Sequence, residues 1–137
     1  VHKFYWALVC AEPKPSEGRL EDMLWRNEKQ NKTYTSLTPK QGAKEARLRY
    51  KLLTATERYF LLEVELFTGR HHQIRVQFAN AGCPLLDDNK YNKKQTKRMA
   101  SLGLFSYSLT FIHPLTKKEV SFEYAPDYAP FTWFSAV

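Results

Sequence analysis

The chain has 137 residues, the length of one ordinary domain. Hydrophobic residues make up 43% of it and aromatic residues 15%, which is enough for a packed core and excludes a disordered segment. No apolar run approaches the about 20 residues of a membrane-spanning helix, so we expect no membrane association. Lys and Arg outnumber Asp and Glu by 21 to 14, a formal charge of +7. This charge indicates a nucleic-acid-binding protein or, alternatively, a basic protein without that role.

The first third of the chain predicts strands separated by loops. Residues 3–10 are aromatic and β-branched enough for a strand. A proline-containing loop at 11–18 follows, and residues 20–25 suggest a short helical turn. Residues 26–32 are polar and expected to be exposed, and residues 33–37 suggest a short strand.

A β-hairpin is the clearest predicted element. Apolar side chains alternate with three cations in residues 46–52 and with two glutamates in residues 59–68. This period of two gives each strand one buried face. The exposed faces are basic on one strand and acidic on the other, so we expect them to attract each other across the pair.

A helix is predicted over residues 71–81. Ile74, Phe78 and Ala81 have the spacing of a stripe that faces the core. Gly82 follows as a helix terminator, and Pro84 blocks any continuation.

The rest of the chain predicts a polar loop and a second hairpin. Residues 87–98 form the loop, and residues 102–112 and 119–124 form the strands, with the turn at 113–118. The loop carries a group of cations that either face solvent or contact phosphate: Lys90, Lys93, Lys94, Lys97 and Arg98. We therefore expect residues 1–137 to form a single α+β domain, with a mainly antiparallel mixed sheet and one well-defined helix.

Two features concern the setting of the chain. Cys10 and Cys83 belong to no CxxC pair or zinc spacing, so we expect reduced thiols and a cytoplasmic protein. The chain opens with Val1 and enters strand-like sequence at once. We therefore expect it to be part of a longer protein, truncated on the N-terminal side.

The junction between the first hairpin and the helix concentrates polar residues: Arg70, His71, His72, Gln73 and Arg75. A helix start presents unpaired N–H groups and the positive end of a dipole, and the arginines add charge, so an anion site is expected. Adjacent histidines on a helix point about 100° apart, and no third ligand has metal-site spacing. We therefore expect no metal.

Residues 66–79 resemble the Leu-x-Thr-Gly-Arg-Thr-His-Gln-Ile-Arg-Val-His signature of the RluA-type RNA pseudouridine synthases. Three further stretches resemble that family in the same order. They are Lys-Phe-Tyr-Trp-Ala-Leu-Val at 3–9, Pro-Leu-Leu-Asp-Asp-Asn-Lys-Tyr at 84–91 and Leu-Gly-Leu-Phe-Ser-Tyr-Ser-Leu-Thr-Phe-Ile-His-Pro at 102–114. The resemblance covers nearly the whole chain.

The resemblance implies an isomerase that converts uridine to pseudouridine in rRNA or tRNA without metal or cofactor. In that family the target nucleotide is flipped out of its stack, and a catalytic Asp attacks the nucleoside. The resemblance assigns Tyr5 to stacking on the base, Arg75 to holding the Asp carboxylate and Leu104 to packing near the base. From the residues alone, these three are also compatible with an ordinary strand aromatic, a surface helix residue and a core leucine. Arg70, His72 and Gln73 are expected to shape the turn or to contact RNA, together with the cations of residues 90–98.

The family's nucleophile lies in a His-Arg-Leu-Asp stretch upstream of the Tyr strand, and no Asp of this sequence has that context. Asp88 matches a family Asp that looks structural. His71 replaces Thr, Asp87 replaces Gly, and Phe105 with Ser106 replaces His-Ala. Two hypotheses follow. The chain is the C-terminal part of an active synthase, which the joint presence of the three site residues favours, or it is a non-catalytic or degenerate RNA-binding module.

Overall fold

The computed structural model describes residues 2–37, 42–112, 115–116, 118–123 and 128–134. Its strands are β1 (His2–Val9), β2 (Glu17–Asn27), β3 (Lys32–Ser36), β4 (Lys44–Ala55), β5 (Phe60–Leu66), β6 (Leu104–Ile112) and β7 (Glu119–Glu123). Its helices are α1 (Gln73–Asn80) and the 3₁₀ helix η1 (Phe131–Phe134). The strands form one sheet in the order β3-β2-β4-β5-β1-β6-β7, and each pairing between these described strands is antiparallel. The predicted α+β fold with a mainly antiparallel sheet is confirmed.

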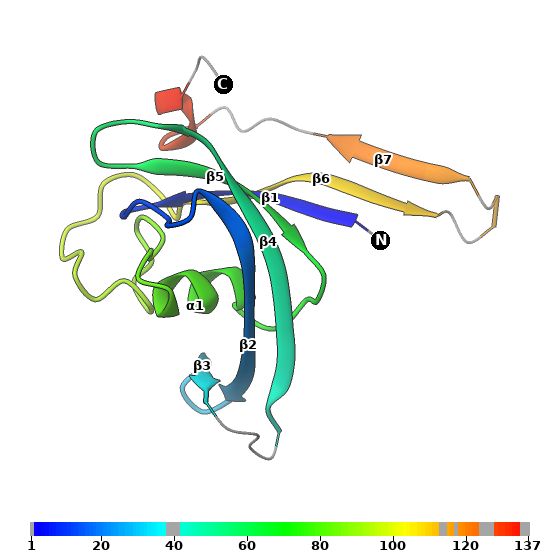
Figure 1. The fold of residues 1–137 in the computed structure, drawn as a ribbon, viewed down its shortest axis with the longest axis horizontal. Coiled ribbons are helices and arrows are strands. Elements are labelled where there is room, and N and C mark those ends of the chain that lie inside the picture. Colours follow the sequence, from blue (N-terminus) through cyan, green and yellow to red (C-terminus); the bar gives the residue numbers. More distant parts are fainter. Residues whose placement is uncertain (1, 38–41, 113–114, 117, 124–127, 135–137) are drawn as a thin grey trace.

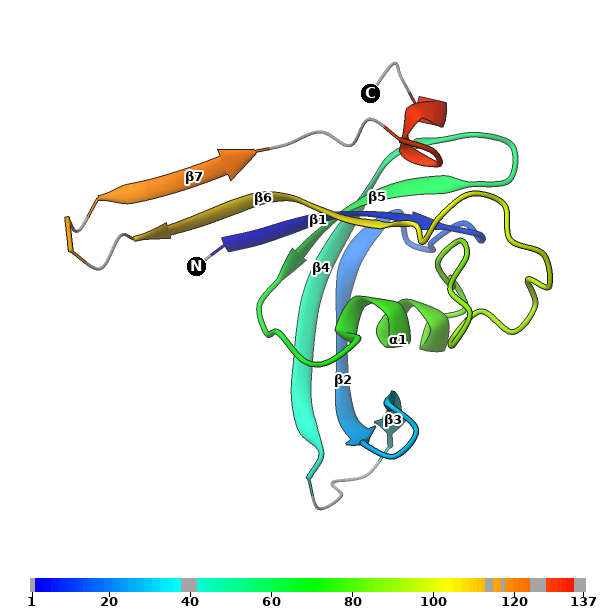
Figure 2. The ribbon, with the colours of Figure 1, turned by 180° about the vertical axis from the view of Figure 1, so that it is seen from behind.

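The sheet curves strongly along β2 and β4, and α1 lies in the hollow of that curve (Figure 1). The opposite view shows the same arrangement, with η1 on the other side of the sheet (Figure 2). The long loop between α1 and β6 also lies on the side of α1. The candidate site is therefore built on the concave face.

The core occupies both faces of the sheet, because successive residues of a strand point to opposite sides. Ala7 and Val9 of β1 belong to the cluster that contains Phe78 of α1. Leu8, between them, belongs to the cluster that contains Phe131 of η1. This second cluster accounts for part of the aromatic content near the C-terminus.

The predicted hairpin forms between β4 and β5. Arg49 lies opposite Glu65 and Lys51 opposite Glu63 in the register. Both pairs make ion contacts, with N–O distances of 2.5 Å and 4.0 Å. The predicted attraction between the basic and acidic faces is confirmed.

The predicted helical turn at 20–25 is wrong, because β2 runs through these residues. Leu20 and Leu24 are four residues apart, a spacing that places two side chains on one face of a strand as well as of a helix. Strand pairing decides between the two, since β2 pairs with β4 from Glu17 to Leu24 and with β3 from Met23 onward. The local sequence around this segment contains no sign of these partners.

The C-terminal end of α1 follows the prediction in part. Ile74 and Phe78 are buried, as expected, but Ala81 is exposed because the helix ends at Asn80. Gly82 has a φ of 84°, and the N–H of Cys83 donates to the carbonyl of Phe78 at 2.8 Å. This is the glycine-terminated helix end that the sequence predicts. In the described part of the chain, no helix is long and apolar enough to cross a membrane.

The second predicted hairpin is formed by β6 and β7, which pair from Ser108 with Glu123 to Ile112 with Glu119. Part of its predicted turn, residues 113–114 and 117, lies outside the described residues. Cys10 and Cys83 are both free, which agrees with the expected reduced thiols. Burial raises the pKa of both thiols.

Candidate functional site

The turn between β5 and α1 is held together by Gln73. Its Oε1 accepts hydrogen bonds from the Thr68 hydroxyl at 2.8 Å and the Arg70 N–H at 3.0 Å. Its Nε2 donates to the carbonyl of Arg47 at 3.0 Å, and the residue is only 2% exposed. Gln73 therefore shapes the turn, one of the two roles expected of it, and its contact with RNA stays a prediction. Arg70 is also tied to the fold, because its Nε donates to the carbonyl of Glu45 at 2.9 Å.

In the first turn of α1, Arg75 forms a two-point ion pair with Asp88. Its Nε donates to Oδ2 at 2.9 Å and one Nη donates to Oδ1 at 2.7 Å. The Asp88 side chain is fully buried, and that of Arg75 is 15% exposed. Oδ1 also accepts the N–H groups of Lys90 at 3.1 Å and Tyr91 at 3.2 Å. The hydrogen bonds that Arg75 donates to Asp88 raise the pKa of Arg75, so this arginine stays charged.

This pair modifies the sequence-based hypothesis for Arg75. That hypothesis gives Arg75 a carboxylate from outside the printed sequence, whereas the structure gives it Asp88. The guanidinium keeps one Nη group with no partner among the residues that the structure describes. Arg75 also lines a cleft of about 450 Å³. It therefore combines a fixed position with one donor group that is available to a second acceptor.

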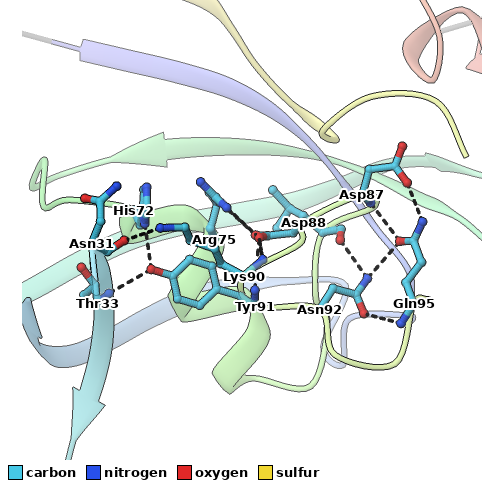
Figure 3. A network of polar contacts seen from close by, with 11 residues as sticks. Asn31, Thr33, His72, Arg75, Asp87, Asp88, Lys90, Tyr91, Asn92 and Gln95 are labelled. Atoms are coloured by element: carbon cyan, nitrogen blue, oxygen red, sulfur yellow. Dashed lines mark hydrogen bonds and ion pairs between the residues drawn. The ribbon is translucent and has the colours of Figure 1, made fainter. Parts of the chain in front are cut away.

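Tyr91 connects three elements around Arg75 (Figure 3). Its ring lies 5.2 Å from the guanidinium carbon of Arg75, a cation–π contact. Its oxygen accepts the N–H of Thr33 in β3 at 2.9 Å and lies 2.8 Å from Nδ1 of His72 at the start of α1. Tyr91 thus links β3, α1 and the loop after α1 around the arginine.

The two histidines are stacked, contrary to the expectation that they point about 100° apart. Their ring centroids are 3.7 Å apart and their planes differ by 30°. The reason is that α1 begins only at Gln73 and His72 has a left-handed φ of 54°. Nδ1 of His71 bonds the hydroxyl of Thr33 at 2.8 Å. Among the described residues, no group of three or more His, Cys, Asp or Glu could hold a metal ion.

The surroundings of His72 favour its neutral form. Burial lowers the pKa of His72 to about 4, and the positive charges of Arg75, His71 and Lys90 act in the same direction. Burial also raises the pKa of Tyr91. At neutral pH the Tyr91 hydroxyl therefore keeps its proton and is available to donate to His72.

Asp87 organises the loop that borders the cleft. Its φ of 56° is left-handed, so this position, where the family has Gly, requires the conformation that glycine adopts freely. Its carboxylate accepts hydrogen bonds from the Gln95 amide at 2.5 Å, the Met99 N–H at 2.8 Å and the Ala100 N–H at 2.6 Å. The substitution therefore ties the two ends of the loop together.

The cleft gathers some of the predicted RNA-contacting residues. It is lined by Arg75, Asp87, Asp88, Asn89, Gln95, Thr96, Lys97, Arg98 and Leu102. The predicted residues Lys97 and Arg98 thus lie with Arg75. Lys93 and Lys94 line a different cavity, and Lys90 donates from Nζ to the carbonyl of Asn31 at 2.7 Å.

Tyr5 and Leu104 come from neighbouring strands on the face that carries α1. In the β1–β6 register Tyr5 lies opposite Ser106, and Ala7 lies opposite Leu104. Both Tyr5 and Leu104 are partly buried and pack on the cluster that contains Phe78 of α1. Their assigned roles stay predictions.

The sequence analysis did not predict the contacts of two residues in this site. Asp88 was expected to be structural, but its ion pair with Arg75 was not predicted. Tyr91 was identified only as part of a motif, with no contact assigned to it. Both belong to the segment 84–91, which is the one signal that connects them. Tyr91 and Thr33 are 58 residues apart in the sequence, and neither local sequence predicts their contact.

Comparisons with known proteins identify relatives. A family model described as RNA pseudouridylate synthase matches residues 1–80. A protein of Aquifex aeolicus named an uncharacterized RNA pseudouridine synthase is 37% identical over 131 residues, covering 88% of this chain and 40% of that protein. The ribosomal large subunit pseudouridine synthase D of Zymomonas mobilis is 29% identical over 131 residues, covering 90% of this chain and 41% of that protein. The chain therefore spans about two fifths of the length of these relatives.

A solved structure supports the same assignment at the level of the fold. Human RNA pseudouridylate synthase domain containing 4 matches with a TM-score of 0.74 and 22% identity, over 90% of this chain and 57% of that one. Proteins named RNA pseudouridine synthases are isomerases, and the resemblance read from the sequence is confirmed. With its motif-bearing turn, its Arg75 cleft and these relatives, the chain belongs to the RNA pseudouridylate synthase family.

Proposed function

We propose that the chain is the C-terminal part of the catalytic domain of a cytoplasmic RNA pseudouridine synthase that acts on uridine in rRNA or tRNA. The observation that carries the proposal is Arg75, which is fixed by Asp88 and lines the cleft with one Nη group available to an acceptor. Lys97 and Arg98 on the rim supply positive charge for phosphates. Family membership supplies the reaction type.

In this proposal the target nucleotide leaves its stack and enters the cleft. A carboxylate nucleophile from a segment outside the printed sequence accepts a hydrogen bond from the available Nη of Arg75, which keeps it ionised. The C1′–N1 bond of uridine breaks and the C1′–C5 bond forms. The C5 proton leaves and N1 gains one, so the product is an isomer. The resemblance assigns Tyr5 to stacking on the base and Leu104 to packing beside it, and neither residue is among those that line the cleft itself.

A non-catalytic RNA-binding module of the same fold is the second candidate. One observation favours it: Asp88 already gives Arg75 an anionic partner, so the arginine has a structural role without any second carboxylate. The departures from the family pattern at His71 and Asp87 point in the same direction. Both candidates bind RNA, so only product formation separates them.

The test measures pseudouridine by mass spectrometry after incubation with uridine-containing RNA. We expect the 137-residue chain to bind RNA without converting it, and the longer protein that contains it to form pseudouridine. In that protein Arg75→Lys should lower kcat by about 10²-fold with little change in RNA affinity, because Lys lacks the planar two-point grip. Lys29→Ala, at an exposed lysine distant in sequence, is the control.

Two results would contradict the proposal. Pseudouridine formed by the 137-residue chain alone would place the nucleophile inside this sequence. RNA binding by the longer protein with no pseudouridine on any rRNA or tRNA would support the binding module instead.

A further inference from the structure

A second cavity lies on the other side of the loop that borders the Arg75 cleft. Its volume is about 800 Å³. Gln95 lines both cavities, so the loop of residues 87–99 is the wall between them. Tyr91, whose ring contacts Arg75, also lines the second cavity.

Much of the lining of this second cavity is apolar or aromatic. The apolar or aromatic lining comes from three places: the residue before β5 and the first residue of β5, the segment after α1, and the end of the loop. These residues are Tyr59 and Phe60, Pro84 and Leu86, and Met99. Met99 is 54% exposed, a large apolar side chain left facing solvent. Flat rings bind well to such a surface.

Three cationic residues also line this cavity: Arg58, Lys93 and Lys94. All three are exposed, and none has an ion-pair partner among the residues that the structure describes. Glu57 is the one acidic residue that lines this cavity within the described chain. The cavity therefore combines an apolar interior with an excess of positive charge.

The cations continue along the loop into the cleft, where Lys97 and Arg98 line the wall. The loop is held in place by its own hydrogen bonds, which fixes the spacing of these charges. Asn92 donates to the carbonyl of Leu85 at 2.9 Å, and the N–H of Gln95 donates to Asn92 at 3.3 Å. A polyanion that follows the loop would pass from one cavity to the other.

We propose that the second cavity binds another nucleotide of the RNA strand whose target nucleotide enters the Arg75 cleft. Its base lies against Phe60 and Tyr59, and the phosphates that join the two nucleotides follow the cations of the loop. The inference rests on the proposed RNA-binding function and extends it to a longer footprint. An acidic peptide is the competing ligand, but it does not account for the charge that continues into the cleft.

The test compares oligouridylates of two and eight nucleotides, labelled with fluorescein, in binding assays with the full chain. One variant removes the three cations (R58A, K93A and K94A), and a second, Ala79→Phe, fills the cavity from α1 without changing charge. The control removes three exposed lysines that line neither cavity (K29A, K44A and K118A). Thermal unfolding checks that each variant is folded.

We expect both cavity variants to bind the octamer about 10-fold more weakly and the dimer unchanged, since only the octamer reaches both cavities. Removing the three cations should lower the slope of log affinity against log salt by about 2, because each contact with single-stranded RNA contributes about 0.7. The control should change the slope less.

Three outcomes overturn the inference. Octamer affinity that is unchanged in both cavity variants places the RNA elsewhere, while the proposed function stands. Weaker binding to an eight-residue glutamate peptide, with RNA affinity unchanged, identifies a protein ligand. Absence of RNA binding by the parent chain refutes the proposed function itself.

Discussion

The ion pair between Arg75 and Asp88 should be among the most stabilising side-chain contacts of this domain. Asp88→Asn keeps the shape of the side chain and leaves an oxygen for the N–H groups of Lys90 and Tyr91. It places an amide N–H against the Arg75 donors, which lie at 2.7 Å and 2.9 Å in the parent. Breaking a buried pair costs about 3–5 kcal/mol, and Arg75 retains some exposure, so we expect about 3 kcal/mol. A domain of this size should then lose about 10 °C in Tm.

The measurement is urea unfolding of the parent, Asp88→Asn, Arg75→Met and the double variant. The double variant should be no less stable than either single variant, because the second change removes the group that the first leaves unpaired. Glu45→Gln breaks the exposed pair with Arg47 and should cost under about 0.5 kcal/mol. A loss below about 1 kcal/mol for Asp88→Asn, or additive single effects, would refute the reasoning.

Three further predictions test other parts of the structure. His72 titrates near 6.5 when unfolded and at about 4 when folded, so the unfolded chain binds more protons between these values. The free energy of unfolding should fall as the pH drops from 6.5 towards 4, and His72→Asn should flatten that fall in denaturant titrations at several pH values. A Cβ at Gly103 would lie 2.7 Å from the carbonyl oxygen of Leu8, so Gly103→Ala should cost about 2 kcal/mol or more. A Cβ at Gly69 would meet only Nζ of Lys3, at 3.9 Å, so Gly69→Ala should change thermal stability little. Asp87→Gly relieves a left-handed conformation but removes three hydrogen bonds, so the two loop amides that it holds should exchange with solvent at least about 10-fold faster by NMR while Tm changes little.

The elements that the sequence predicts well are those fixed by local pattern. The alternation of charges in β4 and β5 predicts that the basic face of one strand lies beside the acidic face of the other, and Arg49 does lie opposite Glu65. Gly82 ends α1 where expected for the same local reason. The resemblance to the family identified Arg75 as a residue of the site.

The features that the sequence does not predict depend on residues distant in the chain. The strand β2 reads as a helical turn until its pairing with β4 is known. The stacked histidines require the left-handed φ of His72, and nothing in the local pattern favours that conformation. The partner of Arg75 is Asp88, which the loop after α1 brings back to the helix.

The partner of Arg75 changes how the two candidate functions should be separated. On sequence grounds, an arginine aimed at a missing carboxylate favours catalysis, since a binding module would not need it. The structure weakens that reasoning, because Asp88 gives Arg75 a stabilising partner in either case. Arg75→Lys therefore affects stability as well as turnover, and a loss of activity alone would be ambiguous. Tyr5→Leu is the more direct probe, because Tyr5 is only partly buried and the change removes the ring that is proposed to stack on the base. A loss of kcat in that variant, with Tm unchanged, would favour catalysis, and equal RNA affinity with no measurable product in parent and variant would favour the binding module.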